Sequence, residues 1–237
     1  RLIPRNPVAD VTAPKQKPPP KQILNDEQLD TFMAAIQADD IWRDFFYTEL
    51  TTGLRLGEIC GLRWEDFDAE HGVLNIQRTV HVEKGGVLTT GDTKTYAGTR
   101  KIVLPASTVQ CLRERKEAAL TDWIFSNPLK PELPVNPRTA YSRLKALLKS
   151  AGLPSIRFHD LRHTFSTHAL SSGVDAKTLS GILGHSRASF TLDTYTHVTG
   201  DMQKRASEVV GDFLTELLGE ELKPWQNAEN GAAAASA

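Results

Sequence analysis

Residues 158–185 read FHDLRHTFSTHALSSGVDAKTLSGILGH, and this stretch indicates a mainly helical protein. Its apolar spacing and its glycines predict one helix over 159–172, closed by Gly173, and a second over 176–183, closed by Gly184. Glycine favours such ends because it adopts the left-handed backbone conformation at little cost. The stretch therefore predicts two short consecutive helices followed at once by His185.

Helical patterns recur on the N-terminal side of this stretch. Asn25 and Gln28 match a helix-capping pair in front of an apolar helix, and a second apolar helix runs to a stop at Gly53. Further helices are expected at 56–62, 107–119, 137–151 and 199–218.

One region has a different pattern. Residues 73–82, 85–88 and 99–104 are rich in Val, Ile and Thr and are separated by glycines, which predicts a small antiparallel sheet. No other β region is indicated. The expected fold class is mainly α with a small antiparallel β-sheet, that is, α+β.

Bulk properties restrict the class of protein. The 237 residues are 40% hydrophobic and 24% charged, which is typical of a globular protein. No apolar run approaches the roughly 18 residues of a membrane-spanning helix, so no membrane association and a cytoplasmic location are expected. The two cysteines predict free thiols rather than a disulfide framework. The net charge of −1 gives no support to DNA binding, which must be argued from site residues.

The first candidate site residue is Arg55, which follows the helix-ending Gly53. Glu58 stands three residues later, where its carboxylate can hold the guanidinium in place. A fixed arginine suits a phosphate site, although a surface arginine with a helical ion pair is an equally good interpretation of this segment alone.

The second candidate group lies in the opening stretch. His159 and Arg162 are three residues apart, so both can reach one small anion from the same helical face. His163 is interpreted as a structural partner inside the helix. His185 follows Gly184, and Tyr195 lies ten residues beyond it. Each of these patterns alone is unremarkable.

Taken together, these motifs resemble the tyrosine recombinases, the phage integrase family. The resemblance extends over roughly residues 23–219 and includes Thr93-Lys94-Thr95 followed by Arg100-Lys101-Ile102-Val103-Leu104-Pro105, which is similar to the hairpin that carries the family's catalytic lysine. It implies the tyrosine recombinase catalytic-domain fold. Residues 183–198 most resemble integrases of conjugative transposons and integrative conjugative elements.

The resemblance implies a phosphate-binding role for three residues. A phosphodiester carries a negative charge that repels nucleophiles, so its oxygens must be neutralised as the transition state forms. Arg55 and Arg162 can each donate a forked pair of hydrogen bonds to these oxygens, and His185 can add another donor. Glu58 and His163 are expected to support them. Neither a cofactor nor a metal ion is expected.

The resemblance also implies how the strand is cut. Tyr195 would attack the phosphorus and form a 3′-phosphotyrosyl bond, with His159 as the base and Lys94 as the acid for the departing oxygen. A site-specific DNA recombinase is therefore expected, for integration and excision of a mobile element.

Domain organisation and partners follow from the same resemblance. Residues 1–24 would be an interdomain linker at the end of a core-binding domain, 25–200 the catalytic domain, 201–219 a helix exchanged between subunits and 220–237 a flexible tail. The expected partners are double-stranded DNA attachment sites and further copies of the chain, as a dimer on each site and a tetramer in synapsis. An excisionase is a candidate partner, and the expected setting is the bacterial nucleoid.

Three alternatives stay open at this point. A zinc hydrolase could use His159 and His163, four residues apart on one helix, although Asp160 stands where the zincin motif has Glu. A type IB topoisomerase shares the chemistry. A DNA-binding relative could keep the fold without activity.

Overall fold

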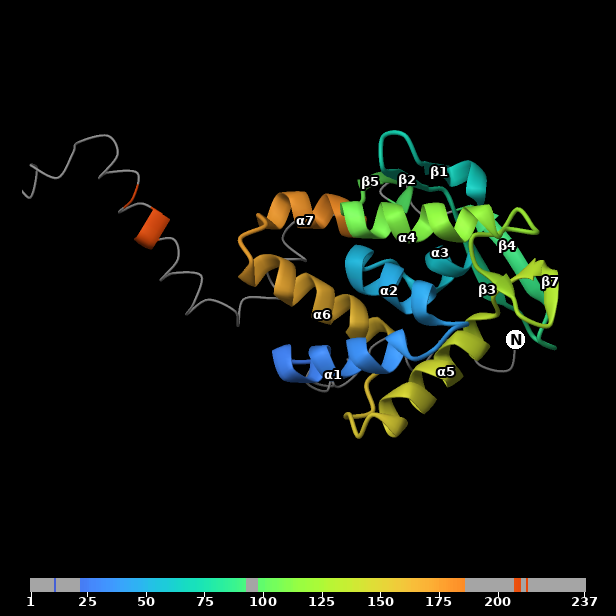
Figure 1. Ribbon diagram of the computed structural model, residues 1–237, viewed down its shortest axis with the longest axis horizontal. Helices are drawn as coiled ribbons and strands as arrows, with labels where there is room; N and C mark the ends of the chain where they lie inside the picture. Colours follow the sequence, from blue (N-terminus) through green and yellow to red (C-terminus); the bar gives the residue numbers. More distant parts are fainter. Residues whose placement is uncertain (1–10, 12–21, 93–97, 186–206, 210–211, 213–237) are drawn as a thin grey trace, which may run out of the picture.

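The structure is a computed structural model that describes residues 11, 22–92, 98–185, 207–209 and 212 (Figure 1). The expected residues Lys94 and Tyr195 lie outside this part of the chain. So do most of the expected linker and of the exchange helix, and the whole expected tail.

Seven helices of five residues or more occur in the described part of the chain. They are α1 (Asp26–Gln37), α2 (Arg43–Thr52), α3 (Leu56–Cys60), α4 (Ala106–Glu117), α5 (Pro137–Ser150), α6 (Phe158–Ser171) and α7 (Ala176–Leu183). Their bounds confirm the predictions for these seven helices within about two residues, and the α+β fold class is confirmed. Most of the helix expected at 199–218 lies outside the described residues. None of the described helices is long and apolar enough to cross a bilayer.

Local capping explains where several helices begin and end. The Asn25 side chain accepts from the backbone N–H of Gln28 at 2.9 Å, and the Gln28 side chain accepts from the backbone N–H of Asn25 at 3.1 Å. At the other end of a helix, Gly53 after α2 and Gly184 after α7 adopt φ values of 60° and 66°. These two glycines turn the chain just before Arg55 and His185.

The strands form three small antiparallel groups. β1 (Phe67–Asp68), β2 (Val73–Ile76) and β5 (Arg100–Val103) make one sheet in the order β1-β2-β5, and Ile76 pairs with Arg100. β3 (Arg78–Val82) and β4 (Leu88–Asp92) make a hairpin. The expected single sheet is therefore divided in two, and the expected strand over 85–88 is largely the turn of the hairpin, because Gly85 and Gly86 have positive φ.

The third β pair was not expected from the sequence. β6 (Ser126–Asn127) and β7 (Lys130–Pro134) pair across a short connection. Three prolines in this segment cannot donate ladder hydrogen bonds, and most of β7 is exposed, so no alternating pattern marks it as a strand. The expectation that only one β region exists was wrong.

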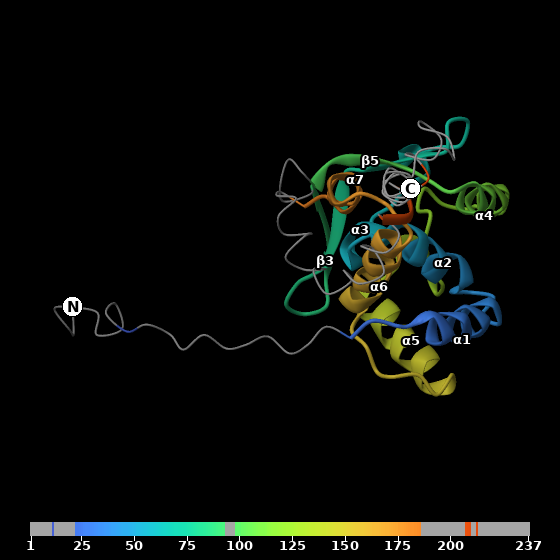
Figure 2. The same cartoon turned by 90° about the vertical axis from the view of Figure 1, so that its left-hand side faces the viewer.

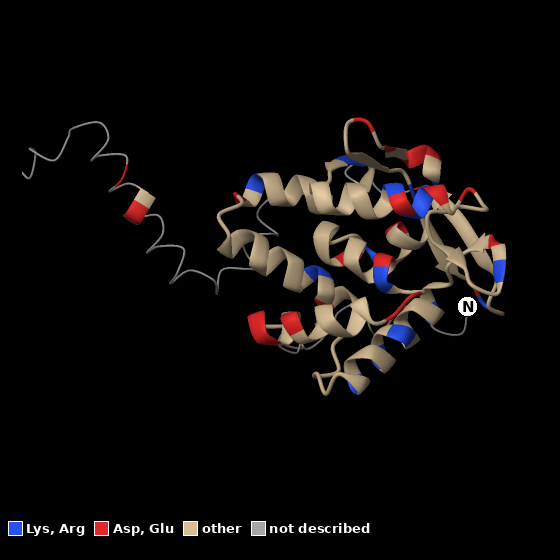
Figure 3. Cartoon of the chain, viewed as in Figure 1, with Lys and Arg blue, Asp and Glu red and all other residues tan. Residues whose placement is uncertain are grey.

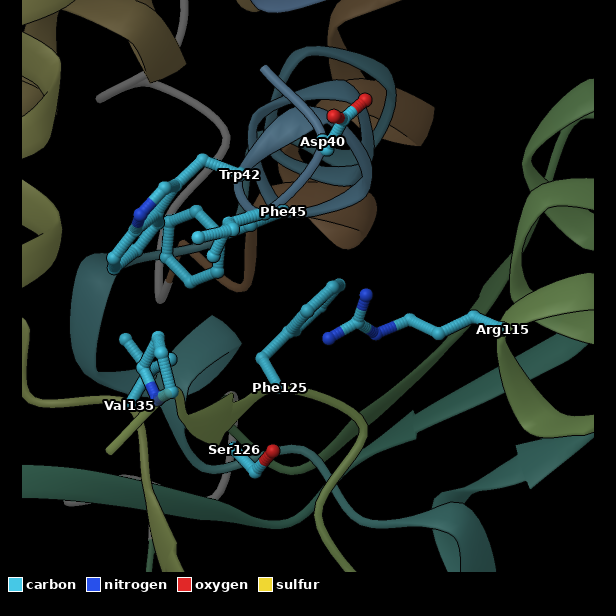
Figure 4. Close-up of a pocket in the computed structure, with 9 residues that line it drawn as sticks. Asp40, Trp42, Phe45, Arg115, Phe125, Ser126 and Val135 are labelled. Atoms are coloured by element: carbon cyan, nitrogen blue, oxygen red, sulfur yellow. The ribbon is translucent and has the colours of Figure 1, made fainter. Parts of the chain in front are cut away.

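An aromatic cluster places α2 against the start of α6, and the two helices lie side by side in both views (Figures 1 and 2). The rings of Phe45 and Phe46 lie 6.2 and 6.4 Å from that of Phe158, between centroids. Phe45 also packs against Phe125 beside an aromatic pocket, where the Arg115 guanidinium lies 5.1 Å from the Phe125 ring centroid (Figure 4). This packing brings the end of α2 close to Arg162 on α6.

The residue at the end of the expected linker joins the same core. Leu24 is fully buried, its backbone N–H donates to the Thr164 hydroxyl at 3.1 Å, and its carbonyl lies 3.0 Å from the His168 ring nitrogen Nε2. The chain is thereby attached to α6 before α1 begins.

Candidate active site

Arg55 lies at the start of α3, immediately after the turn at Gly53. Its Nη1 donates to Glu58 Oε1 at 2.7 Å and its backbone N–H donates to Glu58 Oε2 at 3.0 Å. The carboxylate side chain is 4% exposed and the arginine side chain 41%. The buried Glu58 therefore binds Arg55 as the three-residue spacing predicts, while the Arg55 side chain is partly exposed at the surface.

Arg162 is buried in the second turn of α6, with only 2% of the residue exposed. Its Nη1 donates to the Gly53 carbonyl at 2.7 Å, and its Nη2 donates to the Leu183 carbonyl at 2.7 Å. The same Nη2 lies 3.0 Å from Nε2 of His185. One guanidinium thus links the end of α2, the end of α7 and the candidate histidine.

A third arginine belongs to this cluster, and no pattern in the sequence assigned it a role. Arg100, the first residue of β5, donates through Nη1 and Nη2 to the two carboxylate oxygens of Glu58 at 3.1 and 2.9 Å. Its Nε donates to the Ile182 carbonyl at 2.6 Å. No spacing in the sequence links residues 58 and 100, because they meet only in the folded protein.

The three arginines share one anchoring point at the end of α7. Their guanidinium groups bind three consecutive carbonyls, with Arg100 on Ile182, Arg162 on Leu183 and Arg55 on Gly184. The last carbonyls of a helix lack partners within the helix and carry partial negative charge. The end of α7 therefore both receives hydrogen bonds from these cations and stabilises their charge.

The charges of the cluster shift the pKa values of its members. Burial, and after it the charge of Arg55, lowers the pKa of Arg162 to about 10, so Arg162 stays cationic at neutral pH. Burial alone would raise the pKa of Glu58. The hydrogen bond and charge of Arg100, with those of Arg55, outweigh burial and lower it. Glu58 is therefore an ionised carboxylate between two arginines.

Two histidines complete the cluster, and both are neutral at pH 7. Burial, then the charge of Arg162, lowers the pKa of His185 to about 4. The pKa of His159 is lowered by the same two causes in the same order. Because the Arg162 N–H can only donate, Nε2 of neutral His185 accepts from it and the proton of the ring lies on Nδ1.

His163 is buried behind His159. The two rings meet edge to face, with centroids 4.6 Å apart and planes at 78°. His163 thus contacts a candidate site residue, and its supporting role stays a prediction. Among the described residues, no group of three or more His, Cys, Asp or Glu side chains is arranged to hold a metal ion.

The structure thus brings together residues from α3 and the turn before it, from α6 and from the turn after α7, namely Arg55, Glu58, His159, Arg162, His163 and His185. Lys94 and Tyr195 lie outside the described residues. Such a cluster can bind an anion with oxygens on several sides, because a guanidinium has five N–H donors. The contacts of Arg55 with Glu58 and Gly184 use one N–H of each terminal nitrogen, and each of these nitrogens carries a second N–H.

Charge is unevenly distributed over the molecule, despite the small net charge. Figure 3 shows basic residues along α5, whose sequence contains no Asp or Glu, and acidic residues at the start of α1. The overall charge of −1 therefore says little about how any one surface interacts with an anion.

Comparison with known proteins identifies the family. The model of the phage integrase family matches residues 22–201. The chain is 30% identical over 213 residues to a tyrosine recombinase XerC-like protein of Caldanaerobacter subterraneus, covering 81% of this chain and 54% of the relative. It is 30% identical to the transposase of transposon Tn916 from Enterococcus faecalis, covering 77% and 49%. The chain thus spans about half the length of these curated relatives.

Solved structures agree with the sequence matches. The Tn1549 transposon integrase in complex with transposon right end DNA superposes with a TM-score of 0.71 at 26% identity, covering 88% of this chain and 73% of that one. The XerA recombinase, at 24% identity and a TM-score of 0.63, shows the same fold. The matched range includes every motif residue from Arg55 to Tyr195. On these grounds the chain belongs to the phage integrase family, the tyrosine recombinases.

Proposed function

We propose that this chain is the catalytic part of a site-specific DNA recombinase that cuts and rejoins DNA strands through a covalent bond to Tyr195. Its biological role would be the integration and excision of a conjugative mobile element. The observation that carries the proposal is the convergence of Arg55, Arg162 and His185 at the end of α7. This arrangement offers fixed positive charge and directed donors to one phosphate.

The arginines would stabilise the transition state by charge and by direction. In the attack, phosphorus becomes five-coordinate and its nonbridging oxygens gain negative charge. Arg162 is held rigidly by two carbonyls, so it needs little reorganisation to meet that charge. Arg55 is more exposed and approaches the phosphate from the solvent side of the cluster.

The proton transfers assign roles to the remaining residues. A tyrosine hydroxyl in a model peptide has a pKa of about 10, so Tyr195 would have to lose its proton to a base during attack. His159 is neutral at pH 7 and can take that proton directly or through water. The tyrosine oxygen then bonds to phosphorus as the 5′ oxygen leaves, taking a proton from Lys94. Attack by a 5′ hydroxyl reverses these steps, so no ATP is consumed.

The proposed partner is double-stranded DNA containing the attachment sites of the element. In support, solved structures of the Tn1549 transposon integrase contain transposon end and circular intermediate DNA, and a lambda integrase dimer is bound to its core site. We also propose that the chain assembles as a dimer on each site and a tetramer in synapsis, with residues 1–24 as linker, 25–200 as catalytic domain and 201–219 as an exchanged helix. An excisionase would direct the reaction towards excision.

The covalent step is tested by incubating the protein with a nicked attachment-site duplex and separating the products on a denaturing gel. We expect a protein–DNA adduct with the natural sequence and none with Tyr195→Phe, while noncovalent DNA affinity is nearly unchanged. Tyr141→Phe, at a partly exposed tyrosine of α5, is the control and should retain the adduct. An adduct that persists in Tyr195→Phe would refute the assignment of the nucleophile.

A chelator arm of the same assay separates the recombinase from the zinc hydrolase alternative, which the comparisons do not support. Cleavage should be unaffected by EDTA, because the arginines and histidines supply the charge stabilisation. Loss of cleavage in EDTA, restored by Zn²⁺ or Mg²⁺, would favour a metal-dependent reaction. Exchange of strands rather than relaxation of supercoils would separate a recombinase from a topoisomerase.

Assembly is tested by truncation after Gly200. The shortened protein should keep the folded core but lose ordered multimers on DNA and show altered cleavage. Unchanged multimers and unchanged strand exchange in the truncated protein would show that the C-terminal helix is not exchanged between subunits.

A further inference from the structure

A buried carboxyl group lies behind the arginine cluster and has no role in the proposed mechanism. Glu49 is on α2, one turn before Gly53, and is 0% exposed. Its backbone carbonyl accepts from the Gly53 N–H at 2.8 Å. Neither of its carboxyl oxygens has a hydrogen-bond partner among the described residues. A polar side chain in this position has to be accounted for, because buried carboxyl groups are normally hydrogen-bonded.

Glu49 forms no hydrogen bond with Arg162 or Arg100, the two arginines whose charges act on it. Arg162 directs its hydrogen bonds to the carbonyls of Gly53 and Leu183 and to His185. Arg100 binds Glu58 through both terminal nitrogens. Glu49 therefore interacts with these cations electrostatically without forming a hydrogen bond to them. An ionised carboxylate at this position would lack the hydrogen-bond donors that normally replace its hydration.

The groups that act electrostatically on Glu49 come from three elements. They are Arg162 on α6, Arg100 on β5, and Glu58 and Cys60 on α3. Burial raises the pKa of Glu49 well above its usual range, and the charge of Arg162 opposes this effect without cancelling it. Glu49 in turn raises the pKa of the buried Cys60 thiol, which stays protonated. No described residue of α1 or α4, which also pack on α2, is among these groups.

The state of Glu49 decides how much positive charge the site offers. Three guanidinium groups face one ionised carboxylate, Glu58, so a second carboxylate would cancel a further unit of charge in a place screened from water. A phosphodiester brings one negative charge, and the cluster has to stabilise more as the transition state forms. An incoming anion and an ionised Glu49 therefore compete for the same cations.

We propose that the protonation state of Glu49 sets the charge of the anion site. When Glu49 is protonated and neutral, the site binds phosphate strongly. When Glu49 is ionised, the site binds phosphate weakly. The physiological anion is the DNA phosphate only if the proposed function holds, but the coupling itself requires only an anion. By linkage, the anion strengthens proton binding at Glu49 to the same extent that the proton strengthens anion binding.

The coupling has a definite sign. As pH rises through the titration of Glu49, the site loses one unit of positive charge and anion affinity falls. His159 and His185 are already neutral in that range because their pKa values are lowered, so they do not contribute to the fall. Cys60 does not contribute either, because its raised pKa keeps it a neutral thiol.

The test uses inorganic sulfate, whose charge is constant from pH 6 to pH 9, so that any pH dependence belongs to the protein. Sulfate affinity is measured across this range from the NMR shifts of arginine side-chain N–H groups. In the natural sequence it should fall by as much as about tenfold per pH unit through the titration. In Glu49→Gln, which keeps the shape without the proton, it should stay nearly level. Glu117→Gln, at an exposed end of α4, is the matched control and should behave like the natural sequence.

A second measurement is made on the protein of natural sequence and needs no substitution. The side-chain carboxyl carbon of Glu49 is followed by ¹³C NMR in the natural protein, with and without sulfate. We expect a midpoint well above the usual glutamate value of about 4.3, moved higher by sulfate. An ordinary midpoint, a midpoint unaffected by sulfate, or the same pH dependence in Glu49→Gln as in the natural sequence would each overturn the proposal. If the coupling is found but Tyr195 forms no adduct with DNA, the proposed function fails and this inference stands.

Discussion

Arg100 and Glu58, 42 residues apart in the sequence, are joined by two parallel hydrogen bonds of 3.1 and 2.9 Å. Both side chains are almost fully buried, at 7% and 4% exposure. Since Glu58 also binds Arg55, one carboxylate connects an arginine at the surface to an arginine on the sheet. Arg100 is thus connected to the proposed phosphate site through Glu58 and the end of α7, which makes it a candidate positioning residue.

Replacing Arg100 with Ala should destabilise the protein by about 3–5 kcal/mol, because it leaves the Glu58 carboxylate buried with one partner fewer. Urea unfolding followed by circular dichroism measures this change. Arg138→Ala, at an exposed arginine in the first turn of α5, should change stability by no more than about 0.5 kcal/mol. Equal effects of the two substitutions would show that the buried pair contributes nothing particular.

Replacing Arg55 or Arg162 with Lys should strongly reduce DNA cleavage, since lysine keeps the charge but loses the planar fork of donors. The loss for Arg162→Lys should be on the order of a hundredfold or more, as for removal of a transition-state donor. Single-turnover cleavage of the nicked duplex measures the rate. Arg138→Lys serves as the control, and unchanged rates for both site variants would contradict the phosphate-binding role.

Replacing Gly53 with Ala should be destabilising by more than about 1 kcal/mol. The residue has φ of 60°, and an added Cβ would lie 2.4 Å from Cδ1 of Phe165. Gly181→Ala is the matched control in α7, where an added Cβ meets no atom within 4 Å. There alanine should stabilise the helix by about 0.5–1 kcal/mol. Thermal unfolding of the two variants should therefore shift in opposite directions.

Stability should fall as the pH drops from about 6.5 towards 4. The folded-state pKa of His185 is about 4, whereas an unfolded histidine titrates near 6.5, so the unfolded chain binds more protons between these values. The stability linked to this residue is present above pH 6.5 and is lost towards pH 4. His185→Gln should show a smaller decline in melting temperature over that interval. A decline of the same size in both proteins would exclude His185 as its source.

Contacts and helix ends that depend on residues close together in the sequence could be predicted from it. Contacts between residues far apart in the sequence could not. The capping of α1 by Asn25 and the contact of Arg55 with Glu58 follow from three-residue spacing, which has a fixed meaning in a helix. The stops at Gly53 and Gly184 follow from the backbone freedom of glycine. Family motifs supplied the remaining candidate residues, and the described ones meet in space.

Two of the missed features, the roles of Arg100 and Glu49, depend on tertiary packing. Nothing local distinguishes Arg100 from its neighbour Lys101, because its partner Glu58 belongs to another element. Glu49 lies among polar and apolar residues of α2, and only the assembled core shows that it is buried without a partner. The short pair β6 and β7 was missed because prolines and exposed positions remove the usual strand pattern.

The three carbonyls at the end of α7 also bear on how the site comes apart. If this eight-residue helix detached, Arg55, Arg100 and Arg162 would lose an acceptor together. Local unfolding of α7 and dismantling of the arginine cluster are therefore one event, with one opening free energy. An anion that holds the arginines in place would slow amide hydrogen exchange in a helix it never touches, and a mutation that loosens α7 would weaken all three cation positions at once.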